Sequence, residues 1–210
     1  MRTRIKICGI TRPEDGQAAA AAGADAVGLV FVAASRRCVD LERARAVVAA
    51  LPPFVTPVAL FVDPEPEAAR AVLAALPTAV PQFHGDEPPE LCRAFGRPYL
   101  KAVPMGGGVD PAAYAARYAD ASGLLLDAHP AGGLGGRGET FDWGAIPPLD
   151  RPLILAGGLD ADNVLEAVRR VRPYGVDVSS GVESAPGIKD PRRMAAFVAA
   201  VRRAEATRDP

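Results

Sequence analysis

Residues 4–31, RIKICGITRPEDGQAAAAAGADAVGLVF, hold the pattern that decides the fold. A short β-rich run (4–8) is followed by an Ala-rich segment with helical spacing (13–22) and then by an apolar run (26–31). This order predicts a strand, a helix and a second strand. Two strands separated by a helix are typical of a parallel sheet with crossover helices.

The same alternation continues along the chain. Further β-rich runs lie at 56–62, 79–83, 99–103, 123–127, 152–156 and 175–179, and further helical segments at 41–51, 66–76, 111–119, 162–171 and 191–204. Eight β-rich runs predict one domain over residues 1–210, a (β/α)₈ TIM barrel with a closed parallel sheet surrounded by helices. An open doubly wound sheet is the alternative, but it favours a Gly-rich turn after its first strand, and KICGIT (6–11) has one glycine.

Prolines mark the expected helix starts. Residues 11–14 (TRPE) form a capping-box pattern, and acidic residues precede proline at 63–64, 87–88, 110–111 and 190–191. An acidic side chain there accepts hydrogen bonds from free backbone amides, and proline loses none in the first turn. The sixth helix has the weakest support, because the Gly-rich segment 132–143 is either a flexible loop or a lid over a ligand.

Composition excludes several classes of protein. The 210 residues include 24 basic and 25 acidic side chains, for a net charge of −1, without a basic cluster that would bind nucleic acid. The chain has no apolar run of membrane-spanning length and no signal-peptide pattern, so we expect a cytoplasmic protein without a membrane partner. Three widely spaced cysteines and two histidines predict neither a disulfide framework nor a metal centre.

Alternation along two strands predicts a thiol and a carboxylate inside the barrel. Ile5 and Ile7 share one face of the first strand, so Cys8 lies on the other face with Lys6. Asp127, in LLLDA (124–128), likewise lies opposite two leucines. The charge of Lys6 favours the thiolate, and a thiol facing a carboxylate can act as a base and an acid. A cysteine that only packs as a small apolar residue is the alternative.

Other polar residues follow the strands. Two Gly- or Ser-bearing turns after the last two strands, at 157–158 and 179–181, indicate a phosphate, and hence a phosphorylated small molecule. Arg37 is either a clamp for a carboxylate or an exposed charge, and His84 is either a catalytic base or a hydrogen-bonded loop residue. Lys101 is expected to point into the barrel, where a buried ammonium needs a partner.

Eight segments in order resemble the phosphoribosylanthranilate isomerase family of tryptophan biosynthesis. They are KICGIT (6–11), GLVFVAASRR (28–37), VALFVD (58–63), QFHGDEP (82–88), LLLDA (124–128), GGRGETFDW (135–143), LAGGLDADNV (155–164) and VDVSSGVE (176–183). The resemblance implies a cofactor-free Amadori rearrangement of N-(5-phosphoribosyl)anthranilate to 1-(2-carboxyphenylamino)-1-deoxyribulose 5-phosphate, by a monomer or a homodimer.

The resemblance also implies a role for each matching residue. Asp127 is the general acid to the ring oxygen of the sugar, and Cys8 is the general base to its second carbon. The implied substrate-binding residues are Arg37 for the anthranilate carboxylate, Gln82 and His84 for the sugar, and Gly157, Gly158, Ser179 and Ser180 for the phosphate.

Some positions depart from the family pattern. They are Ala33 and Cys38 beside the anthranilate segment, Pro81 within a strand, and Arg137 in the Gly-rich segment. Two other classes of protein fit the sequence less well. Another phosphosugar barrel enzyme would have Lys or Glu in place of Cys8 and Asp127, and a non-catalytic barrel would be expected to have lost one of them.

Overall fold

Eight parallel strands close into a barrel in the computed structural model, which describes residues 2–107, 109–129 and 140–206. Neighbours in sequence are neighbours in the barrel, and the last strand pairs with the first through Arg4↔Gly175. The strands are β1 Arg4–Cys8, β2 Ala26–Val30, β3 Thr56–Phe61, β4 Val80–Phe83, β5 Leu100–Pro104, β6 Gly123–Asp127, β7 Leu153–Leu155 and β8 Gly175–Val178. The predicted TIM barrel is confirmed.

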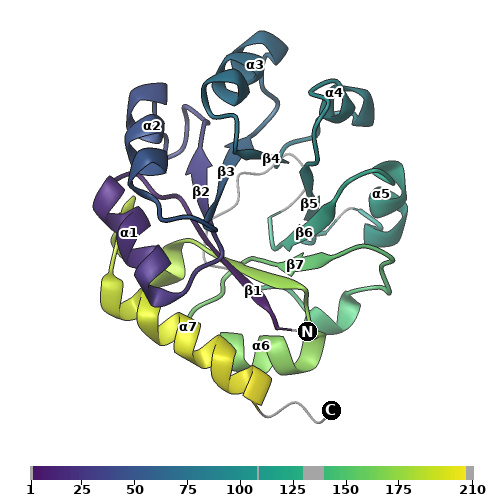
Figure 1. Ribbon diagram of the computed structural model, residues 1–210. Coiled ribbons are helices and arrows are strands. Elements are labelled where there is room, and N and C mark those ends of the chain that lie inside the picture. The colour runs from purple at the N-terminus through teal and green to yellow at the C-terminus, as the bar shows by residue number, and fades with distance from the viewer. Residues whose placement is uncertain (1, 108, 130–139, 207–210) are drawn as a thin grey trace.

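Helices surround the barrel (Figure 1). They are α1 Pro13–Ala22, α2 Leu41–Ala50, α3 Pro66–Ala75, α4 Pro89–Arg93, α5 Pro111–Arg117, α6 Val164–Val171 and α7 Pro191–Ala206. Between β6 and β7 the described residues form only the 3₁₀ turn η1 (Trp143–Ala145), as the weak support for a sixth helix indicated. Residues 130–139, which include Arg137 and most of the expected lid, lie outside the described part of the chain.

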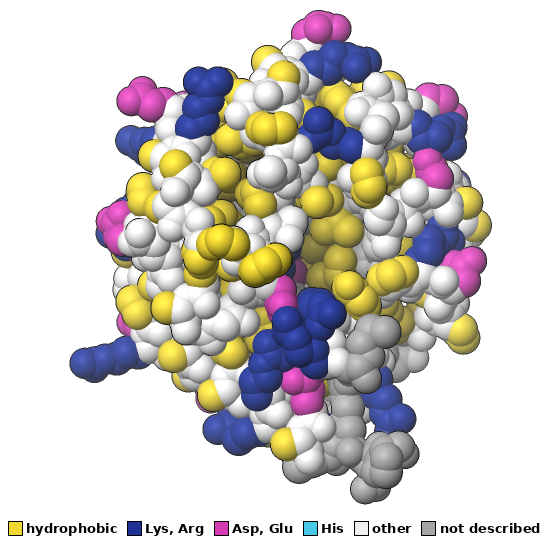
Figure 2. Space-filling model, viewed as in Figure 1, with side chains coloured by type: hydrophobic (Ala, Val, Ile, Leu, Met, Phe, Trp, Pro, Cys, Tyr) yellow, Lys and Arg dark blue, Asp and Glu magenta, His cyan; other side chains and the backbone are white. Residues whose placement is uncertain are grey.

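A short insertion separates β8 from the last helix. It consists of the 3₁₀ turn η2 (Ser180–Val182) and an antiparallel pair, β9 (Glu183–Ala185) and β10 (Ile188–Lys189). On the face drawn in Figure 2, basic and acidic side chains are interspersed around the rim, and a group of Lys or Arg side chains with Asp or Glu beside it lies below the middle of the face. None of the helices in the described ranges has the length and apolar character needed to cross a membrane.

The predicted alternation of side chains is confirmed in β1 and β6. Ile5 and Ile7 of β1 belong to the main apolar core between the sheet and the helices, as do Leu124 and Leu126 of β6. Leu125 packs instead with residues of the neighbouring strands on the inner face of the barrel. Because side chains alternate along a strand, the residues that follow this inner set reach the open end of the barrel.

Lys101 does not point into the barrel, contrary to the prediction. Its strand neighbour Ala102 is on the inner face with Leu125, so Lys101 lies on the outer face under α5. There its Nζ lies 3.0 Å from Glu87 Oε2 and 2.6 Å from the carbonyl oxygen of Gly85. The ammonium also lies over the rings of the α5 residue Tyr114 and of Tyr118. Lys101 therefore belongs to a structural network outside the cavity.

The acidic residues before proline cap only some helices. Asp110 accepts backbone hydrogen bonds at the start of α5, and Asp190 does so at the start of α7. The other two acidic residues, and Thr11 of the predicted capping box, do not cap their helices, because tertiary contacts use their side chains. Thr11 Oγ1 donates to the Gly187 carbonyl, Asp63 Oδ1 accepts from the Asp86 amide, and Glu87 is buried with Lys101.

We expect Glu87→Ala to destabilise the fold strongly. The Glu87 carboxylate neutralises Lys101 and accepts the backbone amides of Asp63 and Gly85, and both charged side chains are fully buried. Removing one partner of a buried pair should lower the free energy of unfolding by about 3–5 kcal/mol. Urea denaturation followed by circular dichroism measures this change.

Glu90→Ala is the matched control. Glu90 also pairs with a cation, Arg93, at 3.4 Å, but this pair is exposed. Exposed pairs of this kind contribute little to stability. Equal unfolding free energies for the two variants would contradict the role given to Glu87.

Candidate active site

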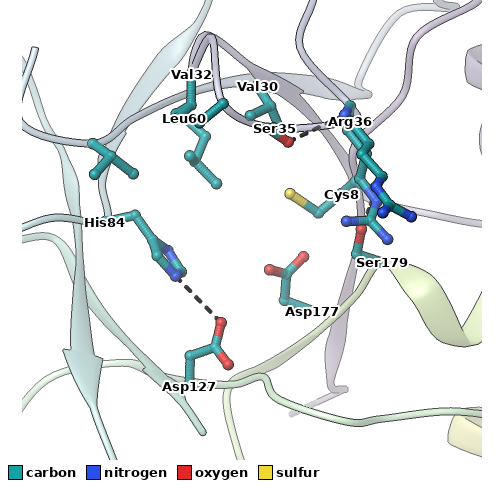
Figure 3. A pocket seen from close by; sticks show the side chains of 13 residues that line it. Cys8, Val30, Val32, Ser35, Arg36, Leu60, His84, Asp127, Asp177 and Ser179 are labelled. Carbon is teal, nitrogen blue, oxygen red and sulfur yellow. Dashed lines mark hydrogen bonds and ion pairs between the residues drawn. The ribbon is translucent and has the colours of Figure 1, made fainter. Parts of the chain in front are cut away.

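A cavity of about 210 Å³ opens at the carboxyl ends of the strands. It is lined by Cys8, Val30, Val32, Ala34, Ser35, Arg36, Arg37, Leu60, Val62, His84, Asp127, Asp177 and Ser179. In Figure 3, Cys8 and Asp127 approach it from opposite sides, with Asp177 between them. Five of the nine predicted site residues thus line one cavity: Cys8, Arg37, His84, Asp127 and Ser179.

Cys8 ends β1 and points into the cavity. The register Cys8↔Gly28 puts a glycine beside it, and a Cβ at Gly28 would lie 2.6 Å from the sulfur, so only glycine leaves room for the thiol. Lys6, on the same face, is engaged with Asp177 through a 2.9 Å contact from Nζ to Oδ1. Burial raises the pKa of Cys8, and the opposing effect of Lys6 does not overcome it. Lys6 favours the thiolate, as predicted, but burial outweighs its charge, so the pKa of Cys8 is raised.

Asp127 ends β6 between two imidazoles. His84 Nε2 lies 3.3 Å from its Oδ2, and His129 Nδ1 lies 3.7 Å from the same atom. Burial alone would raise the pKa of Asp127, but the two imidazoles together hold it below its ordinary value. The carboxylate therefore stays charged in the ligand-free protein. Gln82 lies behind His84, with its Nε2 3.1 Å from His84 Nδ1, and contacts the cavity only through this ring.

Arg37 follows β2 and is held by a carboxylate that sequence reasoning missed. Its Nε and Nη2 donate to the two oxygens of Glu183, each at 2.7 Å. Lys189 Nζ donates to Glu183 Oε1 at 2.8 Å, so one carboxylate pairs with two cations. The Arg37 side chain crosses Gly9, where a Cβ would lie 2.4 Å from Arg37 Cδ. The fork of Arg37 is thus fixed, and its remaining guanidinium nitrogen, Nη1, takes no part in this pair.

The two turns predicted to bind phosphate lie side by side. A Cβ at Gly181, in the turn after β8, would lie 2.1 Å from the carbonyl oxygen of Leu159, in the turn after β7. Gly157 and Gly158 both adopt positive φ, which favours glycine. Ser179 Oγ donates to the Cys8 carbonyl at 3.1 Å. Neither glycine, nor the neighbouring Ser180, lines the cavity itself, so their part in binding stays a prediction.

Comparison with known proteins places the chain in a family. The family model described as N-(5'phosphoribosyl)anthranilate (PRA) isomerase matches residues 5–200. The chain belongs to this family. A PRA isomerase of Halorhodospira halophila is 59% identical over 207 residues, covering 99% of this chain and 100% of the relative, and one of Stutzerimonas stutzeri is 58% identical, covering 95% and 97%.

Solved PRA isomerases have the same fold. The enzyme of Thermus thermophilus superposes with a TM-score of 0.85 at 42% identity, covering 96% of this chain and 99% of the other. Another PRA isomerase, solved with reduced 1-(o-carboxyphenylamino)-1-deoxyribulose 5-phosphate, superposes with a TM-score of 0.81 at 38% identity, covering 95% and 98%. A third structure describes monomers derived from the dimeric enzyme of Thermotoga maritima (TM-score 0.83, 38% identity, covering 95% and 98%).

Sequence reasoning missed four charged or titratable residues of this PRA isomerase site: Asp177, Glu183, His129 and Lys189. Alternation along 175–179 could have placed Asp177 on the inner face, because it is two residues before Ser179. Glu183 and Lys189 belong to the β9–β10 pair, which no period in the sequence indicates. Asp177 is therefore the member of this group that the sequence alone could have supplied.

The raised pKa of Cys8 predicts its reaction with iodoacetamide. Only the thiolate is alkylated, so the rate at Cys8 should still rise above about pH 9 rather than level off near neutrality. Mass spectrometry of the Cys8 peptide measures this rate, and the shape of the pH curve separates ionisation from limited access. A plateau below about pH 8 would show that the thiol is acidic instead.

Proposed function

We propose that Cys8 and Asp127 carry out the isomerisation that defines this family. The observation that carries the proposal is their placement: a thiol and a carboxylate from β1 and β6 line one cavity at the carboxyl end of the barrel. Active sites of such barrels are built at this end. The substrate is N-(5-phosphoribosyl)anthranilate, and the product is 1-(2-carboxyphenylamino)-1-deoxyribulose 5-phosphate, the compound whose reduced form was solved bound to a relative.

The reaction needs one acid and one base. Asp127 gives a proton to the ring oxygen as the bond from this oxygen to C1 of the ribose breaks, and the nitrogen lone pair forms a C=N bond to C1. Cys8 then removes the proton from C2, so the electrons of that C–H bond form a C1=C2 bond and the nitrogen recovers its lone pair. The resulting enolamine becomes the ketone when its hydroxyl proton is lost and C1 is protonated. Atoms and electrons balance without an external oxidant or reductant.

Substrate binding must change the ionisation of this pair. In the ligand-free protein burial keeps the proton on Cys8 and the two imidazoles keep Asp127 charged, whereas the reaction requires a thiolate and a protonated carboxylic acid. Moving one proton from Cys8 to Asp127 once the substrate is bound gives both groups the form that they need. The C=N intermediate carries positive charge beside the thiol, and a nearby positive charge lowers a thiol pKa. The base is therefore formed when it is needed, and the resting cavity holds an unreactive thiol.

The ends of the substrate fit the charged groups around the cavity. Arg37, fixed by Glu183, is proposed to hold the anthranilate carboxylate, because a guanidinium pairs well with a planar carboxylate. His84 is proposed to contact the sugar, and Gln82, behind it, is proposed to orient its ring. The turns with Gly157 and Gly158 and with Ser179 and Ser180 are proposed to bind the phosphate through backbone amides.

We also infer the domain organisation, the location and the oligomeric state of the enzyme. The match over residues 5–200 supports one barrel domain over the chain, 1–210. The biosynthetic reaction supports a cytoplasmic enzyme, and the relation to a dimeric isomerase supports a homodimer as well as a monomer.

Loss of either reacting group should abolish most of the turnover. We expect Cys8→Ser and Asp127→Asn each to lower kcat about 10²–10⁴-fold, the usual contribution of a general acid or base, with little change in unfolding free energy. The assay follows the fluorescence decrease of enzymatically generated phosphoribosylanthranilate.

Cys38→Ser is the matched control for the thiol, because Cys38 is a half-buried cysteine that does not line the cavity. It should retain wild-type kcat. No accelerated loss of fluorescence with wild-type protein would refute the function, and equal rates for wild type and Asp127→Asn would refute the assigned acid.

Glu183→Gln should weaken substrate binding more than chemistry. The amide of Gln keeps one acceptor oxygen but has a donor NH₂ in place of the other and carries no charge, so it cannot accept from both Arg37 Nε and Arg37 Nη2, and Arg37 loses its fixed orientation. We expect KM to rise about ten- to hundredfold, corresponding to one charge-assisted hydrogen bond, while kcat changes less. Steady-state kinetics with Glu90→Gln as an exposed control tests this, and an unchanged KM would remove Glu183 from the site.

A further inference from the structure

Three titratable residues cluster at the wall of the cavity. His84, Asp127 and His129 are all buried, and each offers one ligand atom within 4.8 Å of the other two. His84 and Asp127 line the cavity, and His129 lies beside them without lining it. The proposed mechanism uses Asp127 as the acid and His84 as a sugar contact, and it gives His129 no role.

Two ring nitrogens in this cluster have no hydrogen-bond partner. They are His84 Nε2 and His129 Nδ1, and both side chains are more than nine-tenths buried. The rings are stacked with centroids 4.6 Å apart, and the two nitrogens lie 3.3 and 3.7 Å from the same oxygen, Asp127 Oδ2. Each nitrogen contacts this carboxylate oxygen without a hydrogen bond of normal geometry, and buried polar atoms are normally paired, so the cluster can accept a further group.

We propose that His84, Asp127 and His129 bind a zinc-like transition-metal ion that inhibits the enzyme. Two imidazoles and a carboxylate are ligands that zinc accepts, and imidazole favours zinc, copper, iron or nickel over magnesium or calcium. In a tetrahedral zinc site neighbouring ligand atoms are about 3.4 Å apart. The nitrogen-to-oxygen distances of 3.3 and 3.7 Å lie near this spacing, and the three ligand atoms lie within 4.8 Å of one another. A fourth ligand, such as water, would complete the tetrahedral set.

Gln82 can adapt to such an ion. Its Nε2 lies 3.1 Å from His84 Nδ1, and its Oε1 has no partner. Rotating the amide by half a turn places the oxygen against Nδ1, which then carries the ring proton and leaves the Nε2 lone pair free for the metal. A second hydrogen bond of this kind commonly orients a histidine ligand. The rotation also gives the orphan oxygen of Gln82 a donor.

The metal would stop the reaction by occupying the acid. A coordinated Asp127 oxygen cannot carry the proton that the ring oxygen of the substrate needs. This consequence rests on the proposed function, whereas binding of the metal does not. A binding measurement therefore tests the metal site alone, and an activity measurement tests the inhibition.

Binding is tested with cobalt(II), which reports coordination by its absorption. Titration of wild-type protein should give visible d–d bands of a tetrahedral site without the near-ultraviolet band of thiolate coordination. His129→Gln should lose these bands, while Cys38→Ser should keep them. A thiolate band, or bands that survive in His129→Gln, would overturn the site. Circular dichroism shows whether His129→Gln folds. If it does not, displacement of cobalt(II) by Zn²⁺ from the wild-type protein, with loss of the visible bands, still tests the site.

Inhibition is tested with Zn²⁺ alone, each variant being compared with its own metal-free rate. We expect wild type and Cys38→Ser to be inhibited reversibly, with recovery on adding a chelator. His129→Gln should need at least about tenfold more Zn²⁺ for half-inhibition, because it has lost one ligand. Equal half-inhibition concentrations in all three proteins would refute the proposal. Cobalt bands without inhibition would keep the binding site and refute both its inhibitory effect and the acid role of Asp127.

Discussion

A buried ion pair joins the first and last strands of the barrel and sets the level of the active site. Lys6 of β1 and Asp177 of β8 are opposite each other in the sheet, and their charged atoms meet at 2.9 Å inside the barrel. Two residues further along each strand come Cys8 and Ser179, which are themselves joined by a hydrogen bond. The pair thus links the first strand to the last, where the barrel closes. It lies one layer of side chains below the reacting thiol. Breaking such a pair leaves one uncompensated buried charge.

The same pair explains why the thiol is neutral at rest. Lys6 is the nearest cation on the face of Cys8, but its charge is already matched by Asp177. What remains is burial, which disfavours the thiolate. A neutral buried thiol is protected from alkylation and oxidation, so the site preserves its base between turnovers.

Local patterns in the sequence predicted the barrel and the positions of the reacting groups. A period of two along β1 and β6 is fixed by the pleat, so it placed Cys8 and Asp127 correctly. Lys101 was placed on the wrong face because both faces of a barrel strand are apolar, and its partner Glu87 comes from another loop. Glu183 was out of reach because its pairing with Arg37 joins residues 146 positions apart. Such contacts depend on how the barrel closes, and a local pattern of apolar and polar residues does not predict them.

The doubly paired carboxylate of Glu183 connects the two ends of the substrate site. One of its partners, Arg37, is on the side proposed for the anthranilate, and the other, Lys189, also donates to the carbonyl of Ser179 in the turn proposed for the phosphate. A ligand that draws Lys189 toward the phosphate turn leaves the Glu183 carboxylate paired with Arg37 alone and strengthens that pair. Coupling of this kind is reciprocal, so the affinity for one half of the substrate depends on whether the other half is present. Fragments of the substrate should therefore bind as cooperating ligands of one another.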